Sequence, residues 1–281
     1  MNDMSPSEVG RRRVLAMGAG ALGALAAGAL PAALPAAAQP AVAGTRSKLI
    51  AAAPSWVLKW SPSPSSDGLN AFEGLEDDRS DSHPGVKHIY VEGDHWRFDM
   101  HTRDRDGSDR QRNEVKGMRT GSTLHKIEKD TTWRITYQAY WPSSLTATSK
   151  FTHIMQMKVQ DVGGPLWTLT PRLRSGKPTL TVLTLKDDDS NTEHVLTAYA
   201  PLQNKWIDVE WEFKASNSGG YLAWTLRDGS TVVASGRTTA VDLWRDKNYL
   251  RPKWGIYRSI ESSGLQNTYQ LIRDFKAYQL Q

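Results

Sequence analysis

Apolar and polar residues alternate along most of the chain after Ser55. Within 206–213 every odd-numbered residue is apolar, and Asp208, Glu210 and Glu212 lie between them. The segment 133–140 alternates in the same way. A period of two places one side-chain set on each face of a β-strand, and no long 3.6-residue pattern competes with it. The sequence therefore predicts an all-β protein.

Turn sequences separate the predicted strands at 174–178, 216–220 and 227–230. The stretch 206–233 is thus predicted to form consecutive antiparallel strands, with Asp228-Gly229 as a hairpin turn. Such spacing suggests a concanavalin A-like β-jelly-roll sandwich, in which one curved sheet presents a concave substrate groove. The segment 61–67, rich in serine and proline, is expected to be a loop.

The N-terminal residues carry an export pattern. Gly10-Arg11-Arg12-Arg13-Val14-Leu15 is a twin-arginine motif, an uncharged Ala/Leu/Gly stretch follows, and Ala41-Val42-Ala43 fits a processing site, with 36–38 as a second candidate. Glycine and proline within the stretch argue against a retained membrane anchor. We expect a signal peptide over 1–43, a single domain over 44–281, and a secreted or periplasmic protein that is not membrane-bound after cleavage.

The charge balance is modestly basic. The chain has 35 Lys and Arg against 30 Asp and Glu, a formal net charge of +5. The two signs are interspersed, without the basic stripe of many nucleic-acid binders, so an acidic polysaccharide fits better than a nucleic acid. Cysteine is absent, which excludes disulfides, thiol chemistry and zinc-thiolate sites. We expect a monomer.

Four predicted strands carry polar residues at alternate positions. In 252–258, Lys253 and Tyr257 share one face, while Trp254 and Ile256 share the other. One such strand is usually just solvated, but agreement among several strands indicates a site. Three other predicted strands show the same pattern. Arg112, Glu114 and Lys116 share a polar face on one, Gln156 and Lys158 on the next, and Arg172 and Arg174 on the last.

These residue types suit β-elimination in a uronic-acid polymer. The reaction needs a group that neutralises the carboxylate, a base for the C5 proton and an acid for the departing O4. Arg, Gln, Asn or Lys can do the first by charge or hydrogen bonding. Tyr, His or Lys can do the others, Tyr if cationic surroundings bring its pKa toward the working pH.

Three segments carry a family resemblance. Arg112-Asn113-Glu114, Gln156-Met157-Lys158 and the segment 253–258 (Lys-Trp-Gly-Ile-Tyr-Arg) resemble the ordered motifs of secreted jelly-roll polysaccharide lyases, particularly the glucuronan lyases of polysaccharide lyase family 20 and the heparin lyase I group. The resemblance implies that Lys253 and Tyr257 are functional. The heparin group uses a His base in a Gln-Trp-His strand, whereas Lys158 occupies that place here, which favours a glucuronan-type enzyme.

The sequence thus predicts an endo-acting lyase, best matched to β-1,4-glucuronan, that produces 4,5-unsaturated uronate ends. Strict alternation places His153 on the apolar face, so it ranks below Tyr257 as the base. Alginate or heparin-like chains remain alternative substrates. The predicted catalytic residues are Tyr257, Lys253, Gln156, Arg112 and Lys158, and the predicted substrate-binding residues are Glu114, Arg172, Arg174, Lys116 and His153.

No cofactor is expected to be required, although the resemblance leaves a structural calcium open. The segment 104–109 has acidic calcium-loop spacing but Val115 at the twelfth position, so we interpret it as a solvated turn. The seven His show no i, i+4 pair and no zinc spacing, so no metal site is predicted.

Two other function classes stay open. A non-catalytic lectin would share the sandwich and could use tryptophans such as Trp141, Trp206 or Trp244 at predicted edges. A jelly-roll glycoside hydrolase would need two carboxylates across a cleft. The nearest acidic cluster, Glu73, Glu76 and Asp77, is predicted to lie in a loop.

Overall fold

The computed structural model describes residues 53–186, 188, 190–246 and 248–281. The predicted signal peptide over 1–43 lies outside the described residues. None of the helices in the described part is long and apolar enough to cross a membrane.

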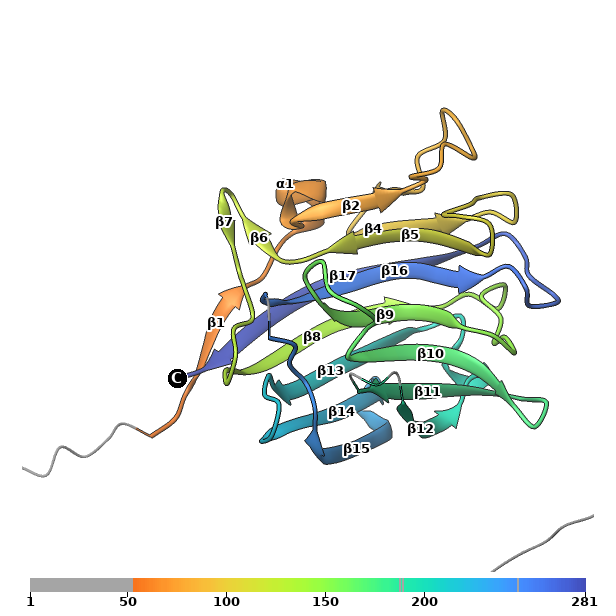
Figure 1. Ribbon diagram of the computed structural model, residues 1–281. Coiled ribbons are helices and arrows are strands. Elements are labelled where there is room, and N and C mark those ends of the chain that lie inside the picture. Colours follow the sequence, from red (N-terminus) through yellow and green to blue (C-terminus); the bar gives the residue numbers. More distant parts are fainter. Residues whose placement is uncertain (1–52, 187, 189, 247) are drawn as a thin grey trace, which may run out of the picture. The chain divides into compact units, whose positions relative to one another are not determined.

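Two antiparallel sheets form the described part of the chain, as predicted (Figure 1). One sheet has eight strands in the order β15-β14-β13-β8-β17-β4-β3, with β1 paired to β17. Its strands are β1 Trp56–Trp60, β3 Ile89–Glu92, β4 His95–Met100, β8 Thr132–Tyr140, β13 Trp206–Lys214, β14 Gly220–Asp228, β15 Thr231–Val241 and β17 Thr268–Leu280.

The other sheet has seven strands in the order β12-β11-β10-β9-β16-β5-β2. Its strands are β2 Gly74–Asp77, β5 Arg110–Lys116, β9 Thr152–Val159, β10 Trp167–Arg174, β11 Lys177–Leu185, β12 Asn191–Ala198 and β16 Leu250–Ser259. The remaining elements are the hairpin β6 Arg119–Thr120 and β7 Thr123–Leu124, the helix α1 Pro64–Asp67, and the 3-10 turns Gly68–Ala71 and Ala200–Leu202.

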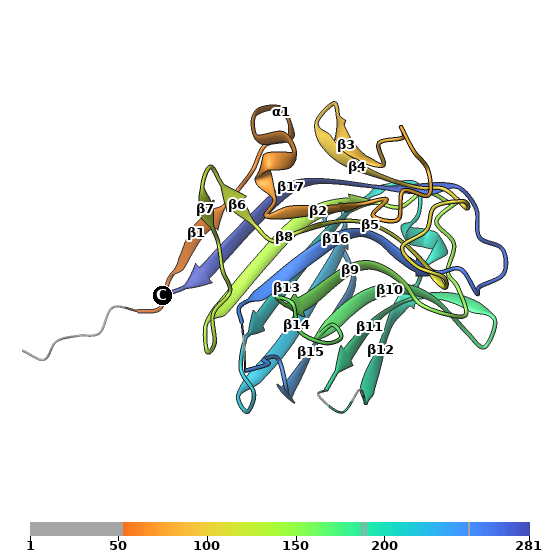
Figure 2. The same cartoon turned by 45° about the horizontal axis from the view of Figure 1, so that its top comes forward.

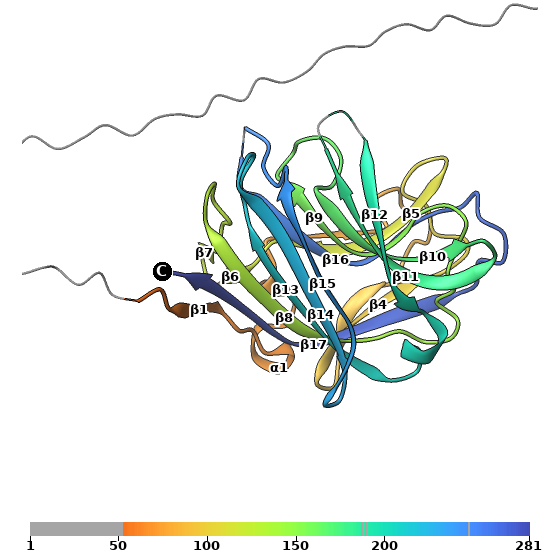
Figure 3. The same cartoon turned by 90° about the horizontal axis from the view of Figure 1, so that it is seen from below.

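The two curved sheets lie against each other as separate layers (Figures 2 and 3). Their facing sides carry the apolar set of each alternating strand, and tryptophans fill much of the space. Trp254 stacks on Trp60 with 5.8 Å between ring centroids and contacts Phe275 at 4.6 Å. Burial of such large rings supplies much of the free energy of folding. The predicted jelly-roll sandwich is confirmed.

Several local predictions are confirmed and others are wrong. Asp228-Gly229 forms the turn between β14 and β15, with Gly229 at a φ of 57°. The segment 61–67 is not all loop, because it contains α1. Trp141 and Trp244, expected at exposed edges, are 0% and 6% exposed and belong to the core.

Candidate active site

The predicted catalytic residues gather on the outer face of the seven-stranded sheet. In its centre, β16 lies between β5 and β9, and Lys253 is directly opposite both Lys116 and Gln156. Further along β16, Tyr257 is opposite Arg112 on one side and His153 on the other. Residues that oppose each other across antiparallel strands share a face. The structure therefore brings together two rows of polar side chains.

His153 is on this polar face, contrary to the prediction from strict alternation. The register between β16 and β9 shifts between Trp254 and Tyr257, so the alternation is interrupted along β9. Ile154 and Met155, although adjacent, are both fully buried in the core. Such a β-bulge redirects the side chains beyond it to the opposite face.

Gly255 makes this irregular strand possible. Its φ is 132°, and a Cβ atom there would lie 2.2 Å from the Asn113 carbonyl oxygen and 2.8 Å from the Glu114 Cα. Only glycine adopts such a conformation without strain and allows this close approach. The glycine between Lys253 and Tyr257 is thus required by the backbone.

Buried ion pairs surround the row that Lys116, Lys253 and Gln156 form. Glu114 accepts a hydrogen bond from Gln156 Nε2 at 2.7 Å, and its Oε2 lies 2.9 Å from Lys253 Nζ and 3.2 Å from Arg112 Nη1. Glu76 on β2 lies opposite Glu114, contacts Lys253 Nζ closely and lies 3.2 Å from Arg112 Nη1. Glu114 is fully buried, and Lys253 is 3% exposed. Two carboxylates therefore share two cations beneath the surface.

Glu76 was missed as a site residue because its segment was predicted to be a loop. It lies on the four-residue strand β2, too short to show a clear alternation. Burial acts to raise the pKa of Glu76, but the charges of Lys253, Arg112 and Arg79 outweigh it and lower that pKa to about 2. The carboxylate is therefore ionised throughout the neutral range.

Arg112 and Lys253 both pair with carboxylates of the protein. In addition to Glu76 and Glu114, Arg112 donates from Nε to Asp106 Oδ2 at 2.8 Å. Arg112 and Lys253 thus have their charges largely balanced by the protein's own carboxylates. Lys116 has a similar position, with its Nζ 3.5 Å from Glu76 Oε1.

Tyr257 is held between cations and aromatic rings. Its hydroxyl accepts a hydrogen bond from Arg110 Nη1 at 3.0 Å, and the Arg112 Cζ lies 3.7 Å from its ring centroid. The His153 ring is 5.7 Å away between centroids, and Phe151 contacts both rings at 4.9 and 5.2 Å. The hydrogen bond from Arg110 and the stacked Arg112 guanidinium therefore fix the position of the Tyr257 side chain.

His153 is a neutral group on this face. Its Nδ1 lies 2.9 Å from the hydroxyl of Thr170 on β10. Burial, together with the charges of Arg172 and Arg112, lowers the pKa of His153 to about 3. A neutral imidazole can accept a proton, and with Nδ1 donating to Thr170 the lone pair would be on Nε2.

Lys158 and Arg172 lie near carboxylates but form no close ion pair with them in the described part of the chain. Among the described residues, no carboxylate forms an ion pair with either side chain, and Arg172 Nε is buried without a hydrogen-bond partner. Burial and the nearby charges of Lys253 and Arg112 lower the pKa of Lys158. Arg174, in contrast, is bound closely by Glu193. The unpaired positive charge therefore lies on the β9 and β10 side of the site.

The segment 104–109 is not a solvated turn. The Asp104 and Asp106 side chains are 2% and 4% exposed, and Asp106 binds both Arg79 and Arg112. Asp104 contacts His83, His88 and His101, which converge on it from two loops. Sequence spacing could not show this group, because its members come from two connections that meet only in the folded chain.

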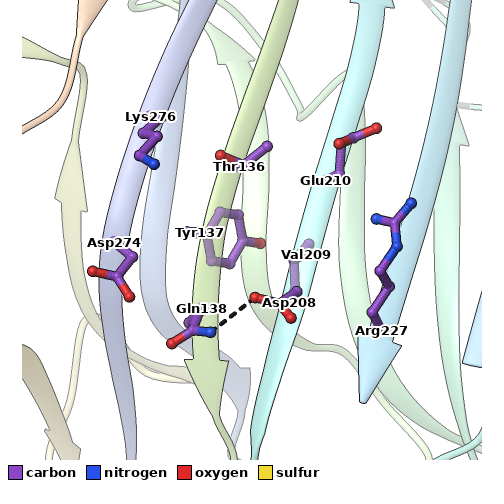
Figure 4. A pocket seen from close by; sticks show the side chains of 9 residues that line it. All are labelled: Thr136, Tyr137, Gln138, Asp208, Val209, Glu210, Arg227, Asp274 and Lys276. Atoms are coloured by element: carbon purple, nitrogen blue, oxygen red, sulfur yellow. Dashed lines mark hydrogen bonds between the residues drawn. The ribbon is translucent and has the colours of Figure 1, made fainter. Parts of the chain in front are cut away.

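A separate hollow of about 500 Å³ lies on the outer face of the other sheet, lined by β8, β13, β14 and β17 (Figure 4). Gln138 donates to Asp208 there at 2.9 Å, and Glu210, Arg227 and Lys276 surround the hollow. None of the predicted site residues lines this hollow.

No family model matches the sequence, and no curated protein matches it. Solved structures do match. The alginate lyase A1-II', a member of polysaccharide lyase family 7, superposes with a TM-score of 0.55 at 13% identity, covering 78% of this chain and 99% of that one. The fold is that of the alginate lyases. An alginate lyase from Pseudomonas aeruginosa gives a TM-score of 0.51 at 13% identity, covering 74% and 98%.

The same fold occurs in an alginate lyase of another polysaccharide lyase family. A marine PL-14 alginate lyase from Aplysia kurodai superposes with a TM-score of 0.50 at 14% identity, covering 79% of this chain and 98% of that one. At these identities the likeness establishes the fold alone, and the chemistry has to be argued from this chain's own residues.

Proposed function

We propose that this protein is a polysaccharide lyase that cleaves a uronic-acid polymer by β-elimination. The observation that carries the proposal is the convergence of Tyr257, His153 and Gln156 with the cations Lys158 and Arg172 on one sheet face. The alginate-lyase fold supports it. Four cations in the network (Arg79, Arg112, Lys116 and Lys253) outnumber the three carboxylates Glu76, Glu114 and Asp106, so the face attracts a polyanion.

The uronate carboxylate binds where Gln156 and these two cations can reach it. Gln156 uses one amide N–H on Glu114 and keeps a second for the substrate. Lys158 and Arg172 supply charge that stabilises the enolate-like intermediate as it develops. Arg112, Lys253 and Glu114 hold Gln156 and Tyr257 in place.

Two neighbouring groups move the protons. A base takes the C5 proton, the electron pair of that bond forms the C4–C5 double bond, and the bond from C4 to O4 breaks. The Tyr257 hydroxyl returns a proton to O4, and either the phenolate of Tyr257 or the neutral imidazole of His153 removes the C5 proton. Their adjacency allows both steps on one side of the sugar ring.

The ionisation and ion pairing of the carboxylates on this face argue against a glycoside hydrolase. A glycosidase acid must be protonated at neutral pH. Glu76 has its pKa lowered to about 2, and both Glu76 and Glu114 are bound by Lys253 and Arg112. Glu76 is therefore ionised at neutral pH and has no proton to donate.

We also propose that the protein cleaves β-1,4-glucuronan within the chain. The heparin lyase I group, which the sequence also resembles, carries a His at the position of Lys158, and this difference favours glucuronan as the substrate. The test is to incubate the protein with glucuronan, alginate and heparin in parallel and to follow the ultraviolet absorbance of the unsaturated uronate together with viscosity. A rise with glucuronan and an early fall in viscosity are expected. A rise in absorbance with alginate alone would still support a lyase but would identify alginate as its substrate.

Tyr257→Phe tests the mechanism. Removing the hydroxyl is expected to lower kcat by at least about 100-fold while polymer binding is kept. Tyr269→Phe is the matched control, because Tyr269 on β17 also lies under a guanidinium, with Arg97 Cζ 4.1 Å from its ring centroid. Polymer binding without product in the unmodified protein would instead support a lectin.

A further inference from the structure

Three histidines and an aspartate converge at one end of the sandwich. His83 and His88 belong to the connection from β2 to β3, and His101 and Asp104 to the connection from β4 to β5. Each connection crosses from one sheet to the other. One potential ligand atom from each of the four residues lies within 4.8 Å of the others. Residues from two separate crossovers thus surround one point.

The distances suit a four-coordinate ion. Asp104 Oδ1 lies 3.0 Å from His83 Nδ1 and 3.2 Å from His88 Nε2, and Asp104 Oδ2 lies 3.3 Å from His101 Nδ1. The three imidazole centroids are 4.9 to 5.5 Å apart. Ligand atoms placed tetrahedrally at zinc-like bond lengths would be about 3.4 Å from one another. Little movement is needed to close the set around an ion.

His88 supplies the second observation. Its side chain is fully buried, and its Nε2 points to Asp104 without a hydrogen bond. Its Nδ1 lies 2.7 Å from Asp77 Oδ1, an oxygen that takes the ring proton. His88 Nε2 lies 3.2 Å from Asp104 Oδ1 without forming a hydrogen bond, and a cation between these two atoms would be bound by both. A carboxylate behind a histidine is also the usual second layer of a metal site.

We propose that His83, His88, His101 and Asp104 bind one structural zinc ion. Three imidazoles and one carboxylate match the preferences of zinc, whereas calcium takes six to eight oxygens. Four protein ligands complete a tetrahedral shell, which is the pattern of a structural site. The partly exposed rings of His83 and His101 leave the ion a way in from solvent.

The ion would fix the loops that supply the lyase face with carboxylates. Asp77, which holds His88, directly follows Glu76, the partner of Lys253. Asp106, two residues beyond Asp104, binds Arg112. Tying the two crossovers together thereby orders both carboxylates that position the cations of the candidate active site.

Metal content and thermal stability test the site without any substrate. The purified protein is stripped with a chelator, dialysed, and titrated separately with zinc, cobalt and calcium chlorides. We expect one equivalent of zinc by elemental analysis, a melting temperature about 10 °C higher with excess zinc, and the visible absorption bands of tetrahedral cobalt. No stoichiometric zinc and no thermal shift, or a shift with calcium alone, would overturn the proposal.

Variants at the partly exposed ligands keep the test sharp even if His88→Ala fails to fold. His83→Gln and His101→Gln are each expected to weaken zinc binding at least about 100-fold and to abolish the cobalt bands. His95→Gln is the matched control, because His95 on β4 contacts Glu92 and Asp94 and lies outside the cluster. Zinc binding that is unchanged in His83→Gln and His101→Gln would also overturn the site, and neither result depends on lyase activity.

Discussion

The two outer faces of the sandwich arise from the same sequence pattern but differ in how deeply their charges lie. On the seven-stranded sheet, Lys253, Glu114 and Gln156 are 3%, 0% and 1% exposed and share partners. On the eight-stranded sheet, Lys276 is exposed and Asp208 is half-buried, with Gln138 as its hydrogen-bond partner (Figure 4). Alternation therefore identifies the polar faces of strands, and burial distinguishes the face that carries the candidate active site.

The physical reason is solvent screening. Exposed ion pairs contribute about 0–1 kcal/mol because water weakens their attraction and the side chains lose entropy. Charges removed from water interact more strongly and must be paired, which fixes their geometry. The buried, paired charges of the seven-stranded sheet can therefore hold Gln156 and Tyr257 in one position. The more exposed charges of the eight-stranded sheet cannot fix their neighbours in this way.

Lys253→Met gives the largest expected effect. The substitution removes the cation between Glu76 and Glu114 and leaves the fully buried Glu114 carboxylate with Arg112 as its remaining ion-pair partner among the described residues. We expect the free energy of unfolding to fall by about 3 kcal/mol. Urea unfolding followed by tryptophan fluorescence measures it.

The matched substitution Lys276→Met on the opposite face should change stability by less than about 0.5 kcal/mol. A double-mutant cycle with Glu76→Gln adds a second check, because the two changes should be far from additive. Equal effects at Lys253 and Lys276 would show that burial does not make the charges of one face more important to stability than those of the other.

Much of this face could be predicted from sequence, because β5 and β16 alternate regularly and pair without a register shift. Tyr257, Lys253 and Arg112 were therefore placed correctly on one side. The ion pairs of Arg112 and Lys253 could not be predicted, since their partners Glu76 and Asp106 come from a short strand and a loop. His153 was misplaced because the bulge opposite Gly255 interrupts the alternation. The cluster around Asp104 depends on two crossovers meeting in space.

Gly255→Ala should have the next largest effect. The new methyl group would meet the Asn113 carbonyl oxygen at 2.2 Å, and the backbone φ of 132° is unfavourable for alanine. We expect a loss of about 2 kcal/mol in unfolding free energy and reduced lyase activity, because the strand that carries Tyr257 must shift. Gly164→Ala is the control, since no atom lies within 4 Å of its added Cβ. Full stability and activity of Gly255→Ala would contradict the proposed need for glycine.

Arg172→Gln should act on substrate binding with little effect on stability. Arg172 lacks an ion pair among the described residues, so its charge is available to an acidic polymer. We expect KM to rise about 10-fold, or about 1.4 kcal/mol, and the salt dependence of kcat/KM to weaken. Arg227→Gln removes an equal charge beside the hollow of the other face and should leave KM unchanged. A similar rise in KM for both variants would mean that net charge alone attracts the polymer.

The smallest expected effect is on the pH dependence of the free energy of unfolding. This dependence reports how far water is excluded from His153 on the polar face. His153 has a pKa of about 3 in the folded protein against 6.5 as its ordinary value. Between these values the unfolded chain binds a proton that the folded chain does not, so the free energy of unfolding falls as the pH drops through this window. In His153→Gln that contribution is lost, and the difference in stability between pH 7 and pH 5.7 should shrink by about 1 kcal/mol. Urea titrations at the two pH values measure the difference. An unchanged difference would show that water reaches the imidazole, and the contrast between the two faces would then rest on the ion network alone.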